Sequence, residues 1–181
     1  MDGSGGGRGR AGDGGGGMSK APWEKGPLDP AETNELSVTR FIAAPPEVVF
    51  RVFTTRTGEW WAPKPYTTPG VEFDLRPGGI ARTDMQSPDG TPHPNQGVFL
   101  EVVPNRKLVT TDAFRVGWIP ATPFITAIFT FEPENEGTLY TARARHWSAE
   151  TRKTHEEMGF TAGWGICAAQ LAELAEAEPK V

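Results

Sequence analysis

The chain has 181 residues, with 18 lysines and arginines against 23 acidic residues, so its formal net charge at pH 7 is −5. Because the two signs are interspersed, this balance excludes the basic surface that binding to nucleic acid or to an anionic membrane needs. A single cysteine excludes an internal disulfide framework and favours a reducing compartment. No apolar run approaches the roughly 18 residues that span a bilayer, and no signal-peptide pattern is present. We therefore expect a cytoplasmic protein without membrane insertion or nucleic-acid partner.

Residues 1–34 predict no fold of their own. The first 17 residues contain ten glycines and almost nothing apolar. Ordering such a segment costs backbone entropy that no buried surface offsets, and the prolines that follow are typical of a linker. We expect a disordered tail and linker at 1–34 and one domain at 35–178. Met1 and Met18 both remain candidate translation starts.

From Glu35 onward, short apolar alternations separated by turn residues predict strands. The first strand is expected at 36–42. Pro45 and Pro46 then suit the opening turn of a helix that ends near Thr55. Further strands are expected at 71–76, 79–86, 97–103, 107–114, 124–132 and 138–147. Their short connections predict an antiparallel meander.

The last predicted element is one long helix from a cap at Ser148 to about Glu176. Its apolar residues recur at intervals of four and three, which places them on one face: Phe160, Trp164, Cys167, Leu171 and Leu174. Gly159 and Gly163 within it indicate either close contact between helix and sheet or space left for a ligand beside Phe160 and Trp164. We expect an α+β fold in which a curved antiparallel sheet of about six or seven strands surrounds this helix. A space left between them would suit a small ligand.

Six sequence segments, in order along the chain, carry a family resemblance: RFIAAPPEVV (40–49), the Trp60-Trp61 pair, DLRPGG (74–79), MQSPDG (85–90), GTLYTA (137–142) and MGFTAGW (158–164). Together they resemble the activator of heat-shock-protein-90 ATPase homologue-like family, within the START-like or SRPBCC superfamily. The resemblance implies the helix-grip fold and a ligand-sized cavity. It implies no single reaction, because superfamily members bind lipids, transport, cyclise polyketides or act as interaction modules.

The co-chaperone activity of the family's name is not carried over to this chain. Members that stimulate the chaperone possess a separate N-terminal domain with an Asn- and Trp-rich motif. The 34 glycine- and proline-rich residues before the first strand do not resemble that domain.

Candidate ligand-binding residues are large apolar side chains and polar groups expected around the cavity: Trp60, Trp61, Arg76, Phe99, Phe114, Trp118, Phe129, Arg143, His146, Met158, Phe160 and Trp164. Trp60 and Trp61 are adjacent, so one is expected in the core and the other at the cavity mouth or in solvent. Trp118, in an irregular stretch at 115–123, is expected to gate the pocket or to anchor its loop.

The charged and nucleophilic side chains leave structural and functional interpretations open. Arg76 and Arg143 are expected either in surface ion pairs, which Asp74, Arg82 and Asp84 could share with Arg76, or pointing inward to hold a carboxylate or phosphate. His146 and His155 are expected to approach each other as a hydrogen-bonded pair or as a general acid and base. His93 is expected in solvent and Cys167 as an inert buried side chain. No metal-ligand spacing and no nucleophile elbow occurs, so no metal or cofactor is expected.

The leading functional hypothesis is a non-enzymatic domain that binds a small apolar or amphipathic molecule. The first alternative is a cyclase, dehydratase or hydrolase in which His146, His155, Asp84 or Arg76 moves protons in the cavity. The second is a co-chaperone-like interaction module, with homodimerisation as an option. These functions differ in whether polar groups converge in one pocket.

Overall fold

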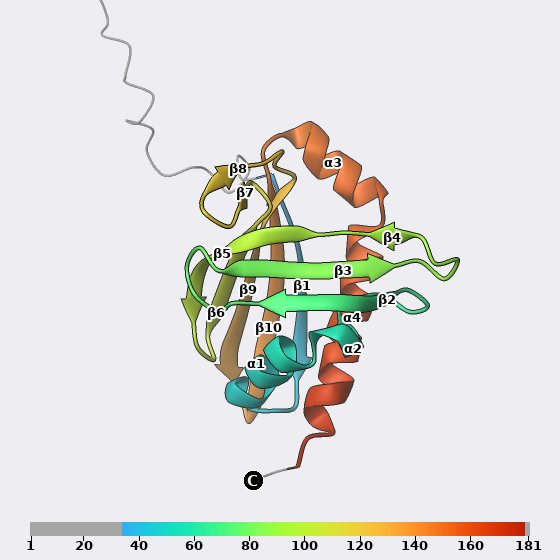
Figure 1. Cartoon of the computed structure of the whole chain (residues 1–181). Coiled ribbons are helices and arrows are strands. Elements are labelled where there is room, and N and C mark those ends of the chain that lie inside the picture. The colour runs from blue at the N-terminus through green and yellow to red at the C-terminus, as the bar shows by residue number, and fades with distance from the viewer. Residues whose placement is uncertain (1–33, 180–181) are drawn as a thin grey trace, which may run out of the picture.

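The computed structural model describes residues 34–179, so the predicted tail and nearly all of the predicted linker lie outside the described residues. The chain forms one strongly curled antiparallel sheet of seven strands: β1 (Glu35–Ile42), β2 (Thr67–Phe73), β3 (Ile80–Gln86), β5 (Gln96–Val103), β6 (Lys107–Thr111), β9 (Ile125–Glu134) and β10 (Gly137–His146). Their order is β1-β10-β9-β6-β5-β3-β2 (Figure 1). Strands from β2 to β10 follow one another as the predicted meander, and β1 pairs with β10 at the far edge.

Three two-residue strands were not predicted. β4 (Pro92–His93) pairs with β3, while β7 (Phe114–Arg115) and β8 (Ile119–Pro120) form a separate hairpin. The stretch predicted as an irregular loop is therefore partly ordered as this hairpin, with Gly117 and Trp118 in left-handed conformations at its turn. β6 ends at Thr111, earlier than predicted. The next side chain, Asp112, instead accepts a hydrogen bond from the backbone of Phe124 at 2.8 Å.

The predicted single C-terminal helix is two helices, α3 (Ala149–Glu157) and α4 (Phe160–Glu176). The predicted cap is present, because Ser148 Oγ accepts a hydrogen bond from the Thr151 amide. The break lies at Gly159, whose φ of 93° belongs to the left-handed region that favours glycine at a helix end. The predicted helix-to-sheet contact is wrong for both glycines. A Cβ at Gly159 would meet nothing within 4 Å, and one at Gly163 would face only Pro63.

α4 lies against β1 and against two short helices, α1 (Pro46–Thr55) and α2 (Thr57–Trp60) (Figure 1). Its buried residues are Phe160, Cys167, Ala168, Gln170, Leu171, Ala172 and Ala175. Trp164 and Leu174, predicted on the same face, are partly buried and pack against this core. The helix thus fills much of the curl of the sheet. Among the helices of residues 34–179, none is both long and apolar enough to span a membrane.

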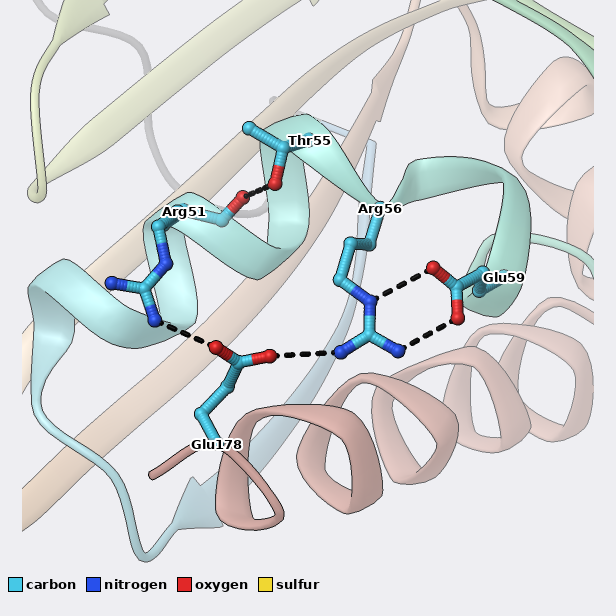
Figure 2. Close-up of polar contacts among 5 residues, drawn as sticks. All are labelled: Arg51, Thr55, Arg56, Glu59 and Glu178. Carbon is cyan, nitrogen blue, oxygen red and sulfur yellow. Dashed lines mark hydrogen bonds and ion pairs between the residues drawn. The ribbon is translucent and has the colours of Figure 1, made fainter. Parts of the chain in front are cut away.

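The end of α4 is tied to α1 and α2 by a charged cluster (Figure 2). Glu178 accepts hydrogen bonds from the guanidinium groups of Arg51 and Arg56, each at 2.8 Å. The guanidinium of Arg56 also forms a bidentate ion pair with the carboxylate of Glu59, with hydrogen bonds of 2.8 and 2.7 Å. The hydrogen bonds from Arg51 and Arg56 hold the pKa of Glu178 below its usual value. The cluster connects the C-terminal end of α4, which packs inside the curl of the sheet, to α1 and α2.

We expect Glu178→Gln to lower the melting temperature by about 1–2 °C at low ionic strength, since exposed ion pairs stabilise little and are screened by salt. At about 1 M salt the difference should vanish. Differential scanning calorimetry at the two salt concentrations measures this. Glu173→Gln is the matched control, because Glu173 is exposed on α4 and forms no ion pair with any described residue. An equal effect of both substitutions would contradict the assigned role of the cluster.

Candidate functional site

A pocket of about 70 Å³ lies between α4 and the inner face of the sheet. Strand alternation places Leu108 and Thr110 of β6 on this face, opposite Phe129 and Ala127 of β9. On the other side of β6, Phe99 of β5 lies opposite Thr110. The small side chains of Thr110 and Ala127 leave room on the floor that larger residues would fill.

The walls of the pocket are aromatic. Trp164 of α4 stacks on Phe129 with 6.0 Å between ring centroids, and Trp61 meets Trp164 edge to face at 5.3 Å. Further apolar lining comes from Phe53, Trp60, Phe73, Ala81, Leu108 and Ile125. This composition suits the apolar part of a small molecule.

The polar lining residues come from α2, from β3 and β6, and from the residues next to β5 and β6: Thr57, Thr83, Asn95, Thr110, Thr111 and Asp112. Asn95 donates to Thr83 Oγ1 at 3.3 Å. Asp112 continues the inward-facing alternation of Leu108 and Thr110. These three positions therefore change from apolar at Leu108 to charged at Asp112. The pocket therefore combines an apolar body with a polar end.

A second, more open pocket of about 190 Å³ lies beside the first. Trp61 and Trp164 line both pockets and so stand between them. The other lining residues lie around the junction of α3 and α4: Pro63, Met85, His155, Met158, Gly159, Phe160, Gly163 and Cys167. Displacement of the two indole rings would join the two spaces.

Seven of the predicted site residues line one or both pockets: Trp60, Trp61, Phe99, Phe129 and Trp164 the first, and Met158, Phe160, Trp61 and Trp164 the second. Trp60 is fully buried and its indole nitrogen donates to the Phe53 carbonyl at 3.3 Å. Trp61 is partly buried and faces the pockets. Trp60 thus belongs to the core and borders the first pocket, whereas Trp61 is partly buried and borders both pockets.

The two predicted arginines do not line either pocket. Arg76 is 67 % exposed and pairs with Asp74 at 2.7 Å. Arg143 lies on the outer face of β10, because Tyr140, Ala142 and Ala144 on that strand point inward and are buried. Its guanidinium faces Glu35 at 3.7 Å. The surface-pair interpretation holds for both arginines, and an inward anion site is wrong.

Phe114 and Trp118 also lie away from both pockets, on the β7–β8 hairpin. Their rings meet edge to face at 6.0 Å, and the Trp118 ring covers Gly78. Trp118 is nevertheless 54 % exposed. Trp118 anchors its own hairpin and does not cover either pocket, so the predicted gate is wrong.

His146 and His155 form a buried pair at one end of the sheet. His146 Nδ1 lies 2.7 Å from the Asn34 carbonyl, which can only accept, so Nδ1 carries the proton. His146 Nε2 is then an acceptor for the proton on His155 Nδ1, 2.9 Å away. Burial, followed by the adjacent His146, lowers the pKa of His155 to about 4. His155 lines the second pocket, whereas His146 lines neither.

Among residues 34–179, two further titratable candidates, Asp84 and Cys167, each contact a structural partner. Asp84 lies on the outer face of β3 beside Arg82, at 3.6 Å. Cys167 donates its thiol proton to the Trp61 carbonyl, and burial raises the pKa of this thiol to about 12. Within residues 34–179, no three histidine, cysteine or acidic side chains gather closely enough to hold a metal ion.

The sequence interpretation missed the polar lining residues, above all Asp112 and Thr110. Their signal was present in the alternation of residues 108, 110 and 112. Because the strand was predicted to continue to residue 114, Thr110 and Asp112 were treated as ordinary strand positions and not as the polar end of a pocket. Whether an inward position faces a pocket or a packed core depends on the side chains opposite, which come from strands distant in sequence.

Comparison with known proteins places the chain in a family. The sequence profile described as Activator of Hsp90 ATPase homolog 1-like protein matches residues 43–176. Protein NE0264 from Nitrosomonas europaea is 42 % identical, with a TM-score of 0.75 over 77 % of this chain and 92 % of that one.

Two more distant structures share the fold. Protein Ms6760 from Mycobacterium smegmatis is 24 % identical, with a TM-score of 0.68 over 82 % of this chain and 94 % of its own. The AHSA1 protein from Silicibacter pomeroyi is 22 % identical, with a TM-score of 0.61 over 80 % and 99 %. No curated protein matches the sequence significantly. The match over residues 43–176 means that this chain belongs to the Activator of Hsp90 ATPase homolog 1-like family, with the helix-grip fold of START-like proteins.

Proposed function

We propose that the protein binds a small apolar or amphipathic molecule between Trp164 of α4 and the inner face of the sheet. The observation that carries the proposal is the aromatic-walled pocket with polar groups at one end. Its volume of about 70 Å³ is well below the roughly 300 Å³ of common ligand pockets. The ligand is therefore small, or it displaces Trp61 and Trp164 to reach the second pocket.

Binding without chemistry is favoured over the enzyme alternative. The histidine pair is the observation that supports an enzyme, but a pKa of about 4 makes His155 a weak base at neutral pH. The thiol of Cys167 is protonated at neutral pH, because its pKa is about 12. For a ligand in the second pocket, His155 would therefore act as a hydrogen-bond partner and not as a general base.

We expect Thr110→Phe to abolish binding of a small amphiphile such as 1-hexanol, because the added ring fills the floor between Phe99 and Ala127. We expect the affinity to fall at least about tenfold, because a tenfold loss corresponds to the free energy of one well-packed apolar contact. Titration followed by tryptophan fluorescence measures it, since Trp61 and Trp164 line the pocket. Thr110→Leu provides a milder second variant.

The matched control is Ile128→Phe, which adds a ring to the opposite face of β9. Ile128 lies next to Ala127 in the strand and points away from the pocket. This variant should bind hexanol as the unmodified protein does. Unchanged binding to folded Thr110 variants would reject the pocket as the ligand site.

The interaction-module alternative, including a homodimer, rests on the β7–β8 hairpin, where Val116, Trp118 and Ile119 are exposed. Light scattering coupled to size-exclusion chromatography tests it. A dimer that dissociates in Trp118→Ala would support this alternative, and a monomer at all concentrations would argue against self-association.

A further inference from the structure

The lining of the first pocket carries negative charge without any positive charge. Among residues 34–179, Asp112 is the one charged residue that lines it, and no lysine, arginine or histidine of this part of the chain contributes to the lining. From this asymmetry, and resting on the proposed binding function, we infer that the pocket selects ligands whose polar end is a primary ammonium group over ligands that end in a carboxylate.

The carboxylate of Asp112 is held in place by backbone groups. Its Oδ1 accepts hydrogen bonds from the amides of Phe124 at 2.8 Å and Ile125 at 3.2 Å. Oδ2 receives only a long contact of 3.4 Å from the Ile125 amide. One oxygen is therefore used to fix the loop that enters β9, while the other keeps most of its capacity to accept a hydrogen bond.

No cation of the described residues forms an ion pair with this carboxylate. None of the ion pairs among residues 34–179 includes Asp112. Arg115 is nearby, but its Nη1 donates to the backbone carbonyls of Gln96 at 2.6 Å and Asp112 at 3.3 Å. The guanidinium thus secures the hairpin and leaves the side chain of Asp112 without a direct partner of opposite charge.

Several hydrogen-bond donors around the pocket are used or enclosed, which leaves the neutral hydroxyl groups of Thr83 and Thr110 as donors. Trp60 Nε1 and Thr57 Oγ1 both donate to the Phe53 carbonyl. Trp61 Nε1 has no partner among the described residues, but protein atoms enclose it completely. A ligand carboxylate would therefore lose its hydration next to the Asp112 carboxylate and find neutral hydroxyl donors but no cation to compensate its charge. A ligand ammonium would gain a charge-assisted hydrogen bond to Asp112 Oδ2.

The test compares three probes with the same six-carbon chain: hexylamine, 1-hexanol and hexanoate, at neutral pH and constant ionic strength. Hexylamine is protonated under these conditions, as a lysine side chain is. We expect hexylamine to bind about tenfold more tightly than 1-hexanol, the gain of one hydrogen bond to a charged group. Hexanoate should bind more weakly than 1-hexanol. Tryptophan fluorescence gives the affinities, and the NMR signals of the Phe124 and Ile125 amides report contact at Asp112.

The key variant is Asp112→Asn, which removes the charge but keeps an oxygen for the Phe124 and Ile125 amides. It should weaken hexylamine binding about tenfold and 1-hexanol binding by a smaller factor, so that the preference for hexylamine is lost. Asp89→Asn is the matched control, because Asp89 Oδ1 also accepts from a backbone amide, that of Thr91 at 3.0 Å, and does not line the pocket.

The outcomes separate this inference from the proposed function. If 1-hexanol binds but hexylamine binds no more tightly, or if Asp112→Asn leaves the preference intact, the selectivity is rejected while the binding function stands. If none of the three probes binds to the folded protein, the proposed binding function is itself rejected, and the selectivity with it.

Discussion

Replacement of Phe53 by alanine is expected to lower the free energy of unfolding by about 3–5 kcal/mol, the usual cost of deleting a buried aromatic ring. Phe53 extends from α1 into the centre of the core, where its ring lies 4.7 Å from Trp60, 4.9 Å from Phe129 and 5.3 Å from Phe131. The cavity left by the ring would be surrounded by rigid aromatic groups that cannot collapse into it. Urea denaturation followed by circular dichroism measures the loss.

Phe41→Ala is the matched control for this substitution. Phe41 lies on the outer face of β1 and is 45 % exposed, although its ring covers Gly137. The control should therefore lose less than about 1 kcal/mol. If the two variants lost equal stability, the aromatic cluster around Phe53 would not be the centre of the core.

Much of the fold was predictable because strand and helix periodicities are local properties of the sequence. The predicted strand at 36–42 corresponds to β1, and the helix opened by Pro45 and Pro46 ends at Thr55 as predicted. Short connections between the later strands correctly predicted the meander. The α+β class followed, since an amphipathic helix had to cover the concave face of the sheet, and the family resemblance implied the helix-grip fold.

The break in the C-terminal helix was not predicted because periodicity alone does not detect it. Residues on both sides of Gly159 have helix-compatible patterns, and a glycine within a helix costs only about 1 kcal/mol. Only the left-handed φ of Gly159 reveals that one helix ends and another begins there. This break turns α3, with His155, towards the end of β10.

The candidate site was less predictable, since it depends on which strand faces point inward. From the sequence alone, Arg143 could have pointed inward to bind an anion. The burial of Tyr140 and Ala142 shows that the even-numbered residues of β10 point inward, so Arg143 points outward. A one-residue change of parity moves every side chain of a strand to the other face. The approach of His146 to His155 was predictable because it depends on a junction of only nine residues.

Stability is expected to fall as the pH is lowered from about 7 to 4, because of His155. Burial lowers the pKa of this histidine from 6.5 to about 4 in the folded protein. Between these values the unfolded chain binds a proton that the folded protein does not, so the free energy of unfolding rises with pH across this window. The contribution is fully present above about 6.5 and is lost by about pH 4, with a size of up to about 3 kcal/mol.

The measurement is urea denaturation at several pH values between 4 and 7, compared with the variant His155→Gln. The variant should be less stable at pH 7, because the hydrogen bond to His146 Nε2 is lost or weakened, but its stability should depend less on pH. The two curves should therefore converge towards pH 4. His93→Gln is the control, since His93 is exposed on β4 and should retain the full pH dependence. A wild-type slope in His155→Gln would mean that another group carries the acid sensitivity.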